Sequence, residues 1–70
     1  MAIKYYKLFD ILNRRNITKT KMRIDIGLST KTLAKISNHE HISMEVLEKL
    51  CIYLRVQPGD LIEFENDHDK

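Results

Sequence analysis

The sequence predicts an all-α fold, a single compact bundle of five short helices. The chain has 70 residues, which is too short for separate cofactor and substrate domains. Hydrophobic residues make up 43% of it and charged residues 31%, with two glycines and one proline, as in an ordinary folded domain. Apolar residues recur at spacings of three and four along much of the chain, which is the period of an amphipathic helix.

The first helix is expected over residues 5–15. Its apolar side chains fall three and four positions apart, and they are Tyr5, Leu8, Phe9, Ile11 and Leu12. Charged and amide residues lie between or after them, so the pattern is that of a helix with one buried face.

A short second helix is expected between Thr18 and about Ile26. Thr18 is suited to the N-cap position because its hydroxyl accepts a hydrogen bond from a free amide of the first turn. Met22 and Ile26 lie four residues apart on one face. Gly27 ends the helix, since glycine reaches the left-handed backbone conformation without a Cβ penalty.

A third helix is expected over residues 30–37, separated from the second by about three residues. Ser29 is a suitable N-cap, and Leu33 and Ile36 share one face. The stretch 38–42 has no helical period and is expected to be a loop.

The fourth helix is expected to begin after Ser43, another N-cap residue. A wide apolar stripe marks it as the most buried helix, formed by Val46, Leu47, Leu50, Cys51 and Leu54. A short fifth helix is expected at Pro58, because proline fits the first helical position. Residues 3–5 and 62–65 also alternate like strands, which allows a small two-stranded pairing of the two ends.

Two short helices joined by a glycine-containing turn are the sequence form of a helix-turn-helix. The segment KTKMRIDIGLSTKTLAKI has this form, and a long helix and Pro58-Gly59-Asp60-Leu61 follow it. In these features the chain resembles the Cro/CI-type (phage-repressor-like) helix-turn-helix transcriptional regulators, over about residues 5–64. The resemblance implies a DNA-binding domain over residues 1–65, and we expect a disordered tail over residues 66–70. Arg23 departs from the family pattern, which usually has a small residue there.

The third helix is expected to enter the DNA major groove. Its N-terminal residues and the face opposite Leu33 and Ile36 point outward, which selects as base-reading residues Thr30, Lys31, Thr32 and Lys35. A solvated polar helix face is the alternative. Helix starts and nearby polar side chains are candidates for phosphate binding, namely Thr18, Lys19, Lys21, Asn38, His39 and Ser43. Thr18 and Ser43 are needed as helix caps in either case.

The charge of the chain is unevenly divided. Residues 1–38 hold nine Lys and Arg against two Asp, a net charge of +7, whereas residues 39–70 hold three Lys and Arg against eight Asp and Glu, a net charge of −5. A basic half that attracts phosphates and an acidic half turned away from them suit a small domain that meets DNA on one face. The expected partner is therefore a double-stranded DNA operator, and the expected function is transcriptional regulation, most simply repression. The alternative is a protein-interaction module on the same fold, such as an antirepressor or an antitoxin-like adaptor.

Other functions lack support in the sequence. Cys51 lies on the apolar stripe, and His39 and His41 lack further ligands at a recognised zinc spacing, so no metal site is expected. The sequence indicates no catalytic constellation, glycine-rich phosphate loop, cofactor or small-molecule ligand, and we expect no enzyme. Apolar runs fall short of a membrane span, and a lone cysteine favours a cytoplasmic protein.

A homodimer is expected, because one helix-turn-helix reads only a few base pairs. The recognition face is basic, so the contact is expected among the apolar residues of the acidic half, namely Val56, Leu61, Ile62 and Phe64, or between terminal strands that pair across a two-fold axis. Burial of the Phe64 ring within the monomer is an equally open alternative.

Overall fold

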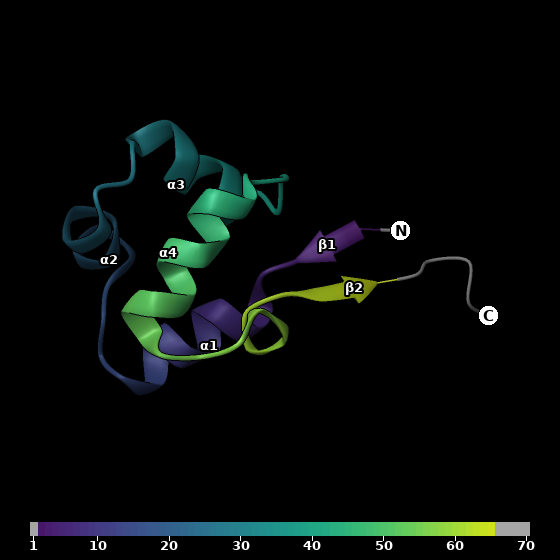
Figure 1. The fold of residues 1–70 in the computed structure, drawn as a ribbon, viewed down its shortest axis with the longest axis horizontal. Helices are drawn as coiled ribbons and strands as arrows, with labels where there is room; N and C mark the ends of the chain where they lie inside the picture. The colour runs from purple at the N-terminus through teal and green to yellow at the C-terminus, as the bar shows by residue number, and fades with distance from the viewer. Residues whose placement is uncertain (1, 66–70) are drawn as a thin grey trace.

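The computed structural model describes residues 2–65, and the expected disordered tail at 66–70 lies outside these residues. Within this described part, four α-helices form the body (Figure 1). In chain order the elements are β1 (Ala2–Lys4), α1 (Tyr6–Arg14), α2 (Lys19–Ile26), α3 (Thr30–Ser37), α4 (Met44–Leu54), the 3₁₀ helix η1 (Pro58–Asp60) and β2 (Glu63–Glu65).

The predicted number of helices is wrong, because residues 2–65 form four α-helices rather than five. The segment after Pro58 forms a single 3₁₀ turn of three residues. The carboxylate of Asp60 accepts a hydrogen bond from the backbone N–H of Gln57 at 3.1 Å, which closes this turn. Leu61 then enters the core, and the chain extends into β2 two residues later, so there is no length for a further helical turn.

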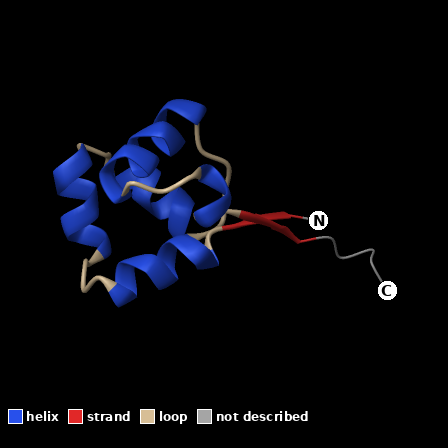
Figure 2. Cartoon of the chain, turned by 60° about the horizontal axis from the view of Figure 1, so that its bottom comes forward, coloured by secondary structure: helices blue, strands red, loops and turns tan. Residues whose placement is uncertain are grey.

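The expected pairing of the two ends is confirmed. Strands β1 and β2 are antiparallel, with Ile3 opposite Phe64 and Lys4 opposite Glu63. They project from the helices as a two-stranded arm (Figure 2). The fold is therefore mostly helical with a small sheet.

The core lies between α4 and the other helices. Among residues 2–65 it consists of ten buried apolar residues, Tyr5, Leu8, Leu12, Met22, Leu28, Ile36, Leu47, Leu50, Leu54 and Leu61. Leu61 is fully buried, so the dimer surface expected from the sequence cannot include it in the folded monomer. The Phe64 ring, by contrast, is 60% exposed and is not part of the monomer core.

Local capping signals explain where the central helices begin. The side chains of Thr18, Ser29 and Ser43 accept hydrogen bonds from the backbone N–H groups of Lys21, Thr32 and Val46, each at 3.0–3.1 Å. These three bonds satisfy amides that have no acceptor within their own helix. The predicted starts of α2, α3 and α4 are thereby confirmed.

Candidate nucleic-acid interface

Helices α2 and α3 form a helix-turn-helix at one end of the molecule (Figure 1). Gly27 lies between them with φ +73°, a left-handed conformation that glycine adopts without a steric penalty. Arg23 stands where a small residue was expected from the family pattern, and its guanidinium donates a 3.3 Å hydrogen bond to the carbonyl of Leu28 in the turn. Arginine is accommodated because its charged end reaches the turn rather than entering the contact between the helices.

The first residues of α3 face solvent. Thr30 and Lys31 are exposed, and Thr32 and Lys35 are partly buried, while Ile36 on the opposite face has no exposed surface. The hydroxyl of Ser29 also donates to the hydroxyl of Thr32 at 3.0 Å, so the first turn of α3 is held on both sides of Lys31. The four residues expected to read bases thus lie on or beside the outer face of one helix.

The start of α2 brings together three of the residues expected to bind phosphate. Thr18 and Lys19 are exposed, and the Lys19 ammonium lies 4.3 Å from the centre of the Phe9 ring. Such a cation–π contact positions the lysine beside the α2 N-terminus. The amides of Lys19 and Thr20 have no acceptor within the helix, as is general for a first turn, and this combination of amides and a cation suits an anionic oxygen.

Lys21, the third of these residues, also contacts an acidic side chain of its own helix. Its ammonium lies 3.2 Å from a carboxylate oxygen of Asp25, which also accepts a 2.6 Å hydrogen bond from the phenol of Tyr53. The bond from Tyr53 and the contact with Lys21 lower the pKa of Asp25, and the same bond raises the pKa of Tyr53. The positive charge of Lys21 is therefore partly balanced within the protein.

His39, a further predicted phosphate ligand, is partly buried against α1. Its Nδ1 accepts a hydrogen bond from the backbone N–H of Tyr5 at 3.1 Å, so the neutral ring carries its proton on Nε2. The ring is parallel to Tyr5, with centroids 6.0 Å apart, and tilted against Tyr6 at 4.7 Å. The phenol of Tyr5 donates to the carbonyl of Glu40, and burial raises its pKa. These contacts make His39 an anchor of the loop that follows α3.

Asn38 and Ser43 flank this loop and are exposed. Asn38 ends α3, and the Ser43 hydroxyl caps α4. The six expected phosphate-binding residues thus fall in two groups, one around the start of α2 and one along the loop between α3 and α4.

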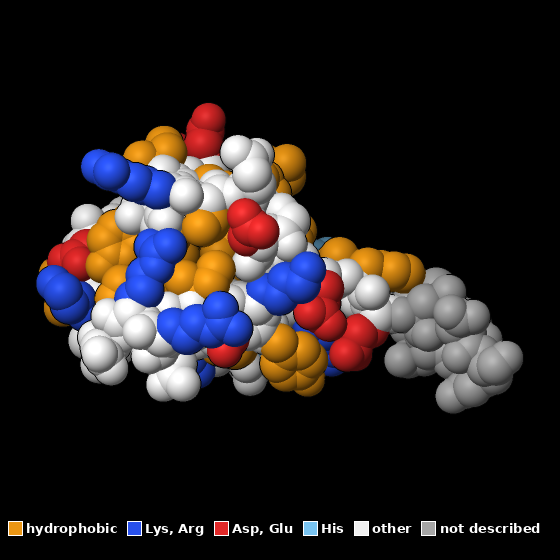
Figure 3. Space-filling model, turned by 90° about the horizontal axis from the view of Figure 1, so that it is seen from below, with side chains coloured by type: hydrophobic (Ala, Val, Ile, Leu, Met, Phe, Trp, Pro, Cys, Tyr) orange, Lys and Arg blue, Asp and Glu red, His pale blue; other side chains and the backbone are white. Residues whose placement is uncertain are grey.

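Charged side chains of both signs lie on the surface. On the face drawn in Figure 3, Lys and Arg side chains spread over the helical body with Asp and Glu side chains among them, and further Asp and Glu side chains lie at the base of the strand arm. Among residues 2–65, no three His, Cys, Asp or Glu side chains come close enough to hold a metal ion together. No helix in that range has the length and apolar character needed to cross a membrane.

Comparison with known proteins decides the family. Residues 7–67 match the Cro/C1-type HTH DNA-binding domain. The chain belongs to this family of helix-turn-helix DNA-binding transcriptional regulators. It is 29% identical over 56 residues to an uncharacterized HTH-type transcriptional regulator, YozG, of Bacillus subtilis (strain 168), covering 80% of this chain and 67% of that protein.

A solved structure agrees with this assignment. The transcriptional regulator VanUg is similar to the chain with a TM-score of 0.86 and 37% identity, over 89% of this chain and 83% of that one. The Cro/C1-type fold therefore holds for nearly the whole described chain, including the helix-turn-helix and α4.

Several contacts of this Cro/C1-type domain had no signal in the sequence. The bond from Tyr53 to Asp25 joins residues 28 positions apart, and the bond from Tyr5 to His39 joins residues 34 apart. The guanidinium of Arg15 donates to the carbonyl of Leu54 at 2.8 Å, where a cation is favoured by the negative end of α4. Residue types alone do not reveal such pairs, because each depends on how the helices pack.

Proposed function

We propose that the protein is a sequence-specific double-stranded DNA-binding regulator that represses transcription, with residues 1–65 as its DNA-binding domain. The observation that carries this proposal is the exposure of Thr30 and Lys31 on the first turn of α3, which Ser29 caps and Ile36 anchors in the core. Lysine can donate to the O6 and N7 acceptors of guanine, and threonine offers a hydroxyl or a methyl group to a base edge. Thr32 and Lys35 complete the base-reading set.

Phosphate binding is assigned to the two groups of residues around α3. Thr18 and Lys19 lie at the start of α2, which precedes α3 in the chain, and Asn38, His39 and Ser43 lie between the end of α3 and the start of α4. For the neutral His39 the contact would use the Nε2 proton, since Nδ1 already accepts from Tyr5. Lys21 contributes mainly a long-range positive charge because Asp25 is close to it.

Two copies are proposed to act together on a pseudo-palindromic operator. A single recognition helix contacts only a few base pairs, and specificity in such proteins comes from half-sites about one helical turn apart. Repression would follow from occupation of promoter DNA. A reporter gene placed behind a selected site would show whether binding lowers or raises transcription.

The first experiment is a titration of a mixed-sequence duplex at two salt concentrations. Four phosphate contacts would reduce the affinity roughly 100-fold between about 50 and about 200 mM salt, because bound counterions are released. Selection from random duplex DNA would then give the preferred site. Absence of binding at low salt, or affinity that does not change with salt, would contradict the proposal and favour the protein-interaction module.

A further inference from the structure

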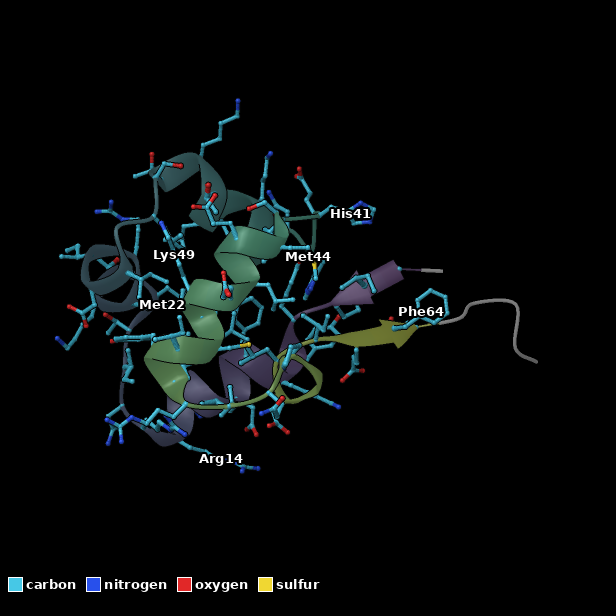
Figure 4. The ribbon with its side chains drawn as sticks, viewed as in Figure 1. Arg14, Met22, His41, Met44, Lys49 and Phe64 are labelled. Carbon is cyan, nitrogen blue, oxygen red and sulfur yellow. The ribbon has the colours of Figure 1, made fainter. Side chains whose placement is uncertain are left out.

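The strand arm has one apolar and one charged face. Ile3 and Phe64 are directly opposite each other in the register, so their side chains project from the same face of the sheet. The flanking residues Ala2, Lys4 and Glu63 project from the other face, as does Glu65. Phe64 remains 60% exposed, so the protein leaves a large aromatic ring on a projecting arm (Figure 4).

An apolar groove lies beside β1. It has a volume of about 310 Å³, and its lining includes Ile3 on the arm, Ile42 just before α4, Met44 at the start of α4, and Ile62. Met44 is 78% exposed and lies on the side of the body that faces the arm (Figure 4). The exposed apolar surface thus continues from the arm onto the helical body along β1.

The two outer edges of the arm differ in charge. Each edge of a two-stranded sheet presents backbone N–H and C=O groups that a further strand can pair with. If β2 paired with its own copy around Phe64, Glu63 would face Glu65 twice, and like charges directly opposite each other are unfavourable. If β1 paired with its own copy around Ile3, Lys4 would face the small neutral Ala2 on both sides, without repulsion.

We propose that two copies of this chain associate through β1, which pairs antiparallel with β1 of the second copy around Ile3. The dimer then contains a four-stranded sheet in the order β2-β1-β1-β2. This inference rests on the proposed function, because that function requires a homodimer. It specifies the surface through which the homodimer forms.

The pairing accounts for part of the exposed apolar surface. The Ile3 side chains of the two copies become direct neighbours, and Phe64 of each copy lies at an outer end of the resulting apolar row. The second β1 strand lies along the groove that contains Ile42 and Met44, so those side chains also lose contact with water. Lys4 stays between Glu63 of its own arm and Ala2 of the second copy.

Cysteine cross-linking tests the register. In a background with Cys51→Ala, Ile3→Cys places two thiols on the two-fold axis, where the Cα atoms of an antiparallel pair are about 4.5–5.5 Å apart, within the range of a disulfide. Phe64→Cys is the matched control on the neighbouring strand, because three strand spacings separate its two copies by about 14 Å. The expected result is a disulfide-linked dimer with Ile3→Cys and little or none with Phe64→Cys.

Cross-linking by Phe64→Cys alone would overturn the proposal in favour of β2 pairing. A wild-type dimer in sedimentation that neither cysteine links would also overturn it, and so would a monomer at every concentration and on DNA. None of these outcomes affects the salt-dependent binding of DNA by the wild-type protein, which tests the proposed function separately.

A charge substitution tests the same register without a cross-linking reaction. Ala2→Lys puts a lysine opposite Glu65 within its own arm, which is favourable, but opposite Lys4 of the second copy, which is not. Two like-charged pairs should raise the dissociation constant of the dimer by about two- to thirty-fold, while the melting temperature of the monomer is kept. Lys49→Glu is the control, because it changes a charge on α4, away from the arm. Equal dimer affinity for wild type and Ala2→Lys would contradict the β1 register.

Discussion

The phenol of Tyr53 in the last turn of α4 donates a 2.6 Å hydrogen bond to the carboxylate of Asp25 on α2. Lys21, one turn earlier on α2, contacts the same carboxylate oxygen. The same turn of α4 also presents the Leu54 carbonyl to the guanidinium of Arg15. The end of α4 therefore ties both α1 and α2 to the longest helix of the domain.

Asp25→Asn should lower the melting temperature at neutral pH and have less effect in acid. The folded-state pKa of Asp25 lies below the ordinary value of 3.8, so the charged carboxylate adds stability that is fully present above that pH. This contribution disappears as the pH falls through the lowered pKa. Thermal unfolding of wild type and variant from pH 7 to pH 2 checks this, and a constant difference across the range would exclude Asp25 as the cause.

Gly27→Ala should destabilise the domain by about 1–2 kcal/mol, because a left-handed conformation brings Cβ of other residues too close to the next carbonyl. A Cβ at Gly27 meets no other atom within 4 Å, so the loss comes from the backbone alone. Gly59→Ala is the matched control, since its Cβ also enters open space and its φ lies outside the left-handed range. Denaturant unfolding measures the stability of both variants. Equal stability of the two would contradict the assignment of a left-handed conformation to Gly27.

His39→Asn should destabilise the domain by about 1–3 kcal/mol, because the backbone N–H of Tyr5 loses its acceptor and the ring loses its aromatic contacts. Asparagine tolerates the φ of +58° at this position, so backbone strain is not added. The exposed His41 in the same loop provides the control His41→Asn. If the two variants unfold at the same denaturant concentration, the anchoring role of His39 is wrong.

Lys31→Ala should weaken binding to a selected site by about 1–3 kcal/mol and binding to random DNA by much less, because Lys31 is assigned to a base. Lys35→Ala should act in the same direction. Lys21→Ala should weaken both kinds of DNA about equally, and Lys49→Ala on α4 is a control with the same loss of charge. Competition titrations measure the ratio of the affinities for specific and random duplexes. If Lys31→Ala lowered both affinities by the same factor, Lys31 would not belong to the base-reading set.

Local signals made much of the fold predictable. Thr18, Ser29 and Ser43 mark helix starts because each cap bonds to an amide three residues away, and Gly27 marks a helix end because of its own backbone freedom. Pro58 was a weaker signal. It gives the position of a helical turn but not its length, which depends on the burial of Leu61 and the start of β2.

Long-range contacts were less predictable. Alternation in residues 62–65 allowed a strand, but the register that sets Ile3 opposite Phe64 depends on the folded positions of the two ends. His39 was assigned to phosphate as a polar residue of the loop, and its partial burial against Tyr5 and Tyr6 was not foreseen. The outer face of α3 followed from helical geometry, because Leu33 and Ile36 determine which residues point away from the core.

The outer face of α3 contributes little to the stability of the fold. Among residues 2–65, the hydrogen bonds and ion pairs that join different elements do not include the side chains of Thr30 and Lys31. Substitutions at these two positions should change the free energy of unfolding by no more than about 0.5 kcal/mol. Mutation and selection can therefore alter what this surface recognises after a gene duplicates, while every copy keeps the same scaffold.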